Sequence, residues 1–155
     1  MFNIGDKICY PMHGVGVVEA IKEQQVLGET ARYYVLRFII GKMTAMVPVN
    51  NAEQVGLRHV IPREECERVV KYMSQPSCQE SENWNQRYRE NLEKLRNGDV
   101  YGVADVVKCL NKRESDRGLS AGERKMLATA RQVLLAELAA SSGEDPQKYM
   151  NLVGA

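Results

Sequence analysis

The sequence predicts an α+β fold in two domains, a small strand-rich β-barrel followed by an all-helical domain. Residues 1–57 carry five basic and five acidic residues, whereas residues 58–155 carry sixteen basic and fifteen acidic residues. Apolar residues in the first part form short runs between glycines, and from Pro62 onward they recur every three or four positions. We therefore divide the chain into domains 1–57 and 58–155.

Four strands are expected in the first domain, because β-branched and aromatic residues gather between turn-forming residues. They cover residues 7–10, 15–27, 32–40 and 43–49, with turns at Gly28-Glu29 and Gly41-Lys42. Pro48 indicates that the last strand lies at an edge of the sheet. Short strands separated by glycine turns over so few residues are typical of a small, strongly bent barrel.

The second domain begins with a helix from Pro62, a residue that fits the first turn of a helix. Ser120 and Glu123 have the spacing of a capping box, which predicts the start of a long helix ending at Gly143. The remaining helices are predicted over about 81–96 before Gly98, from Asp99 to before Gly118, and over 144–152.

Composition argues for a globular protein without a membrane span. The chain has 155 residues, 44% hydrophobic and 26% charged, with a formal net charge of +1. No apolar run approaches the roughly 18 residues that a span requires. The N-terminus lacks a basic region followed by an apolar core, so we expect a cytoplasmic location and no membrane partner.

The residue inventory gives no case for catalysis. Cys9, Cys66, Cys78 and Cys109 form no Cys-x-x-Cys pair and have no histidine at zinc spacing. We interpret them as ordinary thiols of a reducing compartment. Gly14-Val15-Gly16 lacks the third glycine of a dinucleotide loop and is interpreted as a turn. We expect no enzyme activity, no metal site and no cofactor.

Basic residues exceed acidic ones in the middle of the helical domain. Between Trp84 and Arg131 there are eleven Lys or Arg and seven Asp or Glu. This excess is compatible with a surface that faces phosphates, although composition alone favours a solvated helix surface. The eleven basic positions are 87, 89, 94, 96, 108, 112, 113, 117, 124, 125 and 131.

Trp84, the only tryptophan, has two interpretations. Helical periodicity places it on the same stripe as Tyr88, Leu92 and Leu95, which predicts a core position. It also stands at the start of its helix beside amide and basic residues, which is the composition of a wedge that opens a base step. Periodicity and composition leave both possibilities open.

Several motifs together resemble the CarD/CdnL family of bacterial transcription regulators. The segment 5–16, GDKICYPMHGVG, is similar to the opening of that family, which is shared by the RNA-polymerase-interaction domain of transcription-repair coupling factor. The helical part resembles the family more closely still, and the combined motifs span about residues 3–140. These helical motifs are Asn83-Trp84, Arg87-Tyr88, 91–95 (NLEKL), 98–100 (GDV), 117–123 (RGLSAGE), Met126-Leu127 and 130–132 (ARQ).

The resemblance implies a Tudor- or SH3-like barrel that binds the RNA polymerase β subunit, and helices that contact promoter DNA at the upstream edge of the bubble. It implies that Trp84 wedges into the minor groove there and so stabilises the open promoter complex. By the same resemblance, basic residues near Trp84 are phosphate contacts. The expected DNA-binding residues are Trp84, Arg87, Arg89, Arg124 and Lys125.

On the polymerase side this sequence departs from the family pattern. Gln24 and Met46 stand where actinobacterial relatives have arginines, so we do not expect an interface built on ion pairs. Pairing between strand edges needs mainly backbone groups and can persist without those charges. The expected polymerase-binding residues are Gln24, Thr44, Met46 and Val47.

The leading hypothesis is a monomeric, non-enzymatic regulator that bridges RNA polymerase and promoter DNA. The alternative is an adaptor whose barrel binds a protein other than polymerase, with the helices as a structural partner. Co-purification with core polymerase distinguishes these two. An enzyme of unknown type is the least supported interpretation, given the inventory above.

Overall fold

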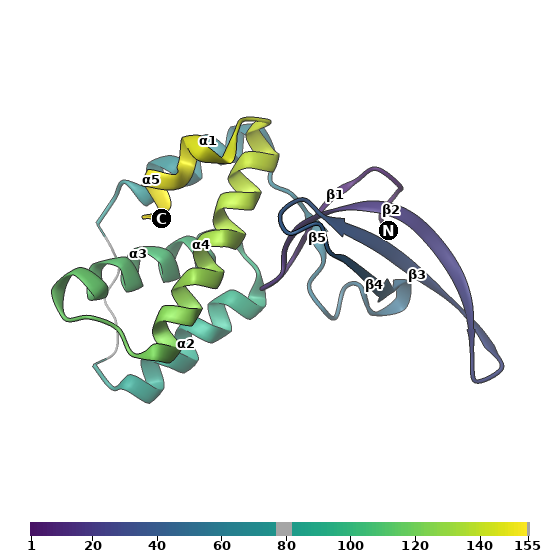
Figure 1. Ribbon diagram of the computed structural model, residues 1–155, viewed down its shortest axis with the longest axis horizontal. Coiled ribbons are helices and arrows are strands. Elements are labelled where there is room, and N and C mark those ends of the chain that lie inside the picture. The colour runs from purple at the N-terminus through teal and green to yellow at the C-terminus, as the bar shows by residue number, and fades with distance from the viewer. Residues whose placement is uncertain (77–81, 155) are drawn as a thin grey trace.

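A computed structural model describes residues 1–76 and 82–154, and it has the predicted order of a β-sheet followed by helices (Figure 1). The predicted two-part α+β fold is confirmed. The last strand of the sheet lies at Arg58–His59, just beyond the expected boundary at residue 57. This strand pairs with the first one, so strand pairing decides where the sheet ends. The change in charge density along the sequence does not reveal such pairing.

The sheet is antiparallel, five-stranded and ordered β4-β3-β2-β1-β5. A bulge between Val18 and Ala20 shifts the register of β2 against β3, and bulges of this kind increase the local bend. Buried residues of one face, among them Ile8, Tyr34 and Leu36, form the core of the sheet domain. The strands are β1 (Lys7–Tyr10), β2 (Gly14–Val26), β3 (Glu29–Phe38), β4 (Thr44–Pro48) and β5 (Arg58–His59).

The β2–β3 hairpin extends well beyond the rest of the sheet, away from the helices (Figure 1). Strand β4 pairs only with residues 33–37 of β3, so the outer part of the hairpin is a two-stranded ribbon. Leu27 and Gly28 form its turn with φ values of 53° and 81°. Two successive positive φ values are the geometry of a type I′ turn, which matches the twist of the flanking strands.

The helical domain packs around α3 and α4. Its core includes Val106, Leu110, Leu127, Leu134 and Leu138, all at most 2% exposed. The helices are α1 (Arg63–Met73), α2 (Trp84–Asn97), α3 (Val100–Asp116), α4 (Ala121–Ser142) and α5 (Met150–Val153), with short 3-10 helices η1 (Val49–Asn51) and η2 (Pro146–Tyr149).

The predicted helix ends are largely confirmed. Asp99 and Ser120 cap α3 and α4, and Glu123 completes the capping box. Gly98 and Gly143 end α2 and α4 in the left-handed conformation, where a Cβ would be strained. The helix predicted from about residue 81 begins at Trp84 within the described chain, because Asn83 caps it, while Ser81 lies outside the described residues.

Helix α4 also contacts the sheet (Figure 1). Cys9 and Val15 of β1 and β2 pack against Ala136 of α4, and these are the buried members of the apolar cluster between the two parts. Cys9, Cys66 and Cys109 are buried, whereas Cys78 lies outside the described residues. Within residues 1–76 and 82–154, no helix is long and apolar enough to cross a membrane.

Candidate functional site

Trp84 is the first residue of α2 and is 44% exposed, which excludes a core position. Asn83 precedes it as the N-cap and accepts a hydrogen bond from the Gln86 amide, so the helix start is fixed. One face of the indole stacks on Tyr88, with ring centroids 5.2 Å apart and planes at 18°. The ring is therefore supported from its own helix while much of it remains accessible.

Glu123, in the first turn of α4, contacts the Trp84 indole from the neighbouring helix. The Trp84 indole N–H donates to Glu123 Oε1 at 3.2 Å and to the Ser120 hydroxyl at 3.4 Å. Arg87 donates from Nε to Glu123 Oε2 at 3.1 Å. Because α2 and α4 are distant in sequence, only the packing of these two helices brings the capping glutamate to the tryptophan.

The Glu123 carboxylate is buried but well compensated. Burial raises its pKa, but hydrogen bonds and charge from Arg87, with further bonds from Ser120, outweigh burial and hold the pKa below the usual value. The carboxylate is therefore ionised at neutral pH. It fixes the direction of the Trp84 ring through a charge-assisted hydrogen bond.

Arg87 does not have the exposure that a phosphate contact requires. It is 2% exposed and forms a buried ion pair with Glu123, so the expectation that it contacts DNA directly does not fit the structure. The reason is helical geometry, since Arg87 lies one turn from Trp84 on the side that faces α4. Its role here is to support the tryptophan site.

Three other predicted basic residues are exposed. Arg124 and Lys125 directly follow Glu123 in the first turn of α4. Arg89 lies on another side of α2 with Gln86 and Glu90, and its Nε donates to the Asn85 carbonyl. Arg124 and Lys125 thus share the first turn of α4 with the glutamate that binds Trp84, whereas Arg89 lies on α2 away from that glutamate.

On the sheet domain, the predicted partner-binding residues fall in two places. Strand β4 is an edge of the sheet, and Thr44 and Met46 on it are exposed. Val47 is 3% exposed and belongs to the sheet core, so its side chain is not an interface residue. Gln24 is exposed on the β2–β3 ribbon, opposite Ala31 and beyond the reach of β4.

The hydrogen-bond pattern of β4 shows which backbone groups face outward. The Phe38 amide donates to the Met43 carbonyl at 2.8 Å, and bonded and non-bonded pairs alternate from there along antiparallel strands. Ala45 and Val47 therefore direct their backbone groups toward β3. Thr44 and Met46 direct theirs toward the open edge, where they are available to another strand.

Apolar side chains surround this edge. Ile39, Ile40, Met43 and Met46 are between 43% and 69% exposed, and all four lie on β4 or on the turn that leads into it. Exposed apolar groups concentrated in one place are typical of a protein-interaction surface.

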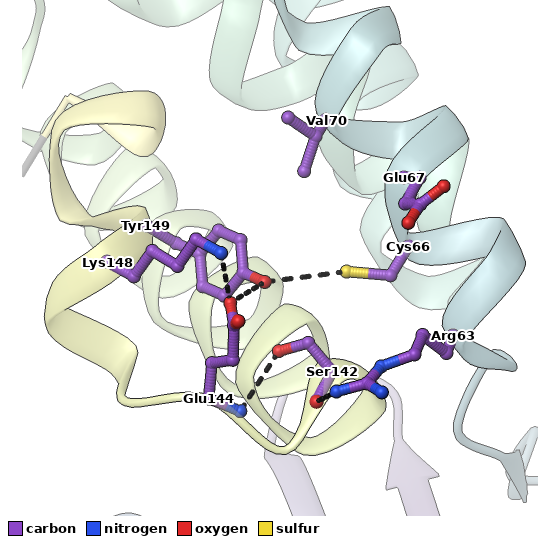
Figure 2. Close-up of a pocket in the computed structure, with 8 residues that line it drawn as sticks. All are labelled: Arg63, Cys66, Glu67, Val70, Ser142, Glu144, Lys148 and Tyr149. Carbon is purple, nitrogen blue, oxygen red and sulfur yellow. Dashed lines mark hydrogen bonds and ion pairs between the residues drawn. The ribbon is translucent and has the colours of Figure 1, made fainter.

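A pocket lies between α1 and the C-terminal segment, and several of the residues that line it bind one another (Figure 2). Glu144 accepts hydrogen bonds from Lys148 and Tyr149, and Arg63 donates to the Ser142 carbonyl. The Arg63 bond thus joins α1 to the end of α4, and the Glu144 bonds lie within the segment that follows α4. In the described parts of the chain, no cluster of three or more His, Cys, Asp or Glu residues has the arrangement of a metal site.

Two family models cover almost the whole chain. Residues 2–61 match the CarD-like/TRCF RID domain, and residues 68–154 match the CarD C-terminal domain. The chain belongs to the CarD family. This membership confirms the resemblance seen in the sequence motifs, and the CarD family is one of transcription factors rather than enzymes.

Individual CarD-family proteins resemble the chain to different extents. "Putative transcription factor YdeB" of Bacillus subtilis (strain 168) is 36% identical over 143 residues, which cover 92% of this chain and 94% of that protein. A solution structure of the 72-residue N-terminal domain of Myxococcus xanthus CarD is 29% identical, with a TM-score of 0.34. It covers 38% of this chain and 79% of its own.

Sequence reasoning missed the residues that support Trp84. Ser120 and Glu123 were recognised as a capping box, but nothing local shows that the same carboxylate also accepts the indole N–H. Tyr88 lies one helical turn from Trp84, and this spacing is the signal that could have predicted stacking.

Proposed function

We propose that this CarD-family protein bridges the RNA polymerase β subunit and promoter DNA at the upstream edge of the bubble, and thereby stabilises the open promoter complex. The observation that carries the proposal is Trp84, an exposed aromatic ring at a helix start that Glu123 holds in one direction. Exposed Arg124 and Lys125 follow Glu123 in the first turn of α4. Membership in a family of transcription factors supports a role in transcription.

The proposal has two arms, namely contact with DNA and contact with polymerase. The DNA arm depends on a higher affinity for the open promoter state than for the closed one. An aromatic ring that enters an opened base step finds no such step in closed duplex, so it favours the open state. Stacking on a base contributes about 1–3 kcal/mol, and this range corresponds to a shift of roughly 5- to 150-fold in the equilibrium. Arg124 and Lys125 would hold nearby phosphates, and so make binding sensitive to salt.

The polymerase arm rests on the free edge of β4. The outward backbone groups of Thr44 and Met46 can accept and donate hydrogen bonds to a strand of the β subunit, with Met46 as an adaptable apolar contact. Gln24 on the ribbon would add a polar contact. Such an interface needs no ion pair, so we expect it to tolerate salt better than the DNA contact.

The two arms together explain the near-neutral charge. A net charge of +1 gives little general attraction to DNA. Tethering to polymerase raises the effective concentration at promoters, so a weak DNA contact is sufficient there.

The test is the lifetime of open complexes formed by the cognate polymerase, measured with and without the protein after addition of a competitor. We expect a longer lifetime with the protein. Met46→Pro removes an outward amide donor without removing a bond to β3, whereas Met46→Leu keeps that donor. Met46→Pro should lose polymerase binding in a pull-down and Met46→Leu should retain it. An unchanged lifetime, or equal binding by both variants, would refute the corresponding arm.

A further inference from the structure

Arg58 and Glu137 form an ion pair that joins the sheet to the helical domain. Arg58 lies on β5, and its two terminal nitrogens donate to the two Glu137 oxygens at 2.6 and 2.7 Å. Glu137 lies within the apolar face of α4 and is 1% exposed. A carboxylate in such a position is stable only because a partner compensates its charge.

The same arginine also binds the end of α2. Its Nε and Nη2 atoms donate to the Gly98 carbonyl at 3.0 and 2.7 Å, and Gly98 is the left-handed C-cap of that helix. Glu137 Oε2 accepts a further bond from the Ile61 amide, at the exit from the sheet. One side chain on the sheet therefore binds two helices at once.

Backbone packing at this joint is close as well. A Cβ atom at Gly98 would come within 2.7 Å of Pro11 Cγ, which follows β1 directly. The apolar part of the joint is small, since its buried members in the described chain are Cys9, Val15 and Ala136. Burial alone lowers the pKa of Arg58, but the bonds to Glu137 outweigh burial and raise it, so the guanidinium stays charged.

The two helices that Arg58 binds are the ones that carry the Trp84 site. Helix α2 runs from Trp84 at its start to Gly98 beside the sheet, and α4 runs from Glu123 in its first turn to Glu137 (Figure 1). Both helices link the joint at one end to the tryptophan at the other. A rotation at the joint would therefore move Trp84 relative to the edge of β4.

We infer that Arg58 is a positioning residue that fixes the direction in which Trp84 is presented relative to the β4 edge. This inference rests on the proposed function for its consequence, but the joint itself can be measured separately. Lysine at this position would keep the charge but cannot form the two-pronged contact with Glu137 together with the bonds to Gly98. Arg58→Lys is therefore the decisive variant.

The experiment uses the full chain and measures backbone residual dipolar couplings in a weakly aligning medium. In the unmodified protein, one alignment tensor should fit the couplings of both domains. In Arg58→Lys, the two domains should need different tensors, while amide shifts around Trp84 and β4 stay in place. Arg68→Lys is the matched control, because Arg68 forms an exposed ion pair with Glu65 within α1. It should keep a single tensor.

The functional readout is the open-complex lifetime. Arg58→Lys should shorten it at least fivefold toward the value without protein, with polymerase binding unchanged. Should Arg58→Lys fail to fold, Glu137→Gln provides the same two measurements, since it keeps the shape and removes the charge. A single tensor in the folded variant, or an unshortened lifetime, would overturn the inference. Separate tensors alongside an unmodified protein that has no effect on lifetime would instead refute the proposed function and retain the joint.

Discussion

At the scale of single residues, the site depends on one carboxylate with several partners. The Glu123 carboxylate accepts the Ser120 backbone N–H in the capping box, compensates the buried Arg87 and accepts the indole N–H of Trp84. Each of these bonds restricts the others, because the carboxylate oxygens have fixed positions. The exposed tryptophan thus has a defined orientation, which lowers the entropic cost of inserting it into DNA.

Trp84→Ala should leave the protein folded and abolish most of its effect on open complexes. A buried tryptophan would cost about 3–5 kcal/mol on truncation. Trp84 is half exposed, and its loss removes a hydrogen bond of about 0.5–1.5 kcal/mol together with the stacking on Tyr88. Thermal melting and open-complex lifetime test the two statements, and Trp84→Phe should be intermediate in lifetime. A large drop in the melting temperature of Trp84→Ala would instead indicate that Trp84 has a structural role.

The Glu123 site should weaken in acid. Its pKa is lowered in the folded state, so its contribution to stability is complete above the unfolded pKa of about 4.3 and is lost as pH falls through the lower folded value. Since Trp84 is the only tryptophan, its fluorescence should change in this window below about pH 4.

Glu123→Gln provides the comparison for that titration. This variant should be less stable than the unmodified protein at pH 7, and the difference should shrink as pH falls below about 4. Denaturant unfolding at a series of pH values measures it. Parallel curves for the two proteins would contradict the assignment of the carboxylate.

At the scale of elements, the start of α4 has both a structural and a functional role. Ser120→Ala removes the acceptor for the Glu123 amide and should cost about 0.5–2 kcal/mol in the free energy of unfolding. Ser120→Thr keeps a hydroxyl and should cost less. Urea unfolding of the two variants tests this, and an unchanged midpoint for Ser120→Ala would argue against the cap. Binding to polymerase through β4 should be unaffected by both.

At the scale of the whole molecule, the two arms should fail in different ways. Loss of the polymerase contact removes a tether whose effective concentration is on the order of millimolar, so a large excess of free Met46→Pro protein should restore open-complex lifetime in part. Trp84→Ala keeps the tether and lacks the wedge, so excess protein should not restore the lifetime. A titration of each variant measures this, and equal responses would contradict a bridging mechanism.

The sequence by itself determined the order of elements and most of their ends. Strand alternation, helical periodicity, the capping box and the terminal glycines are local signals, and local backbone preferences decide them. The motifs also determined the family. Local signals did not determine exposure, because helical periodicity favoured a core position for Trp84 and the family resemblance implied an exposed phosphate contact at Arg87.

Only the tertiary structure decided which of these residues meet. Arg87 is buried and Trp84 is exposed because α2 packs on α4 at a particular rotation, which brings Glu123 between them. Glu137 interrupts an apolar stripe in the sequence, and its partner Arg58 lies 79 positions away on another domain. Contacts over such separations depend on the packing of whole elements, and so the joint and the tryptophan site could be recognised only once the helices and the sheet were placed together.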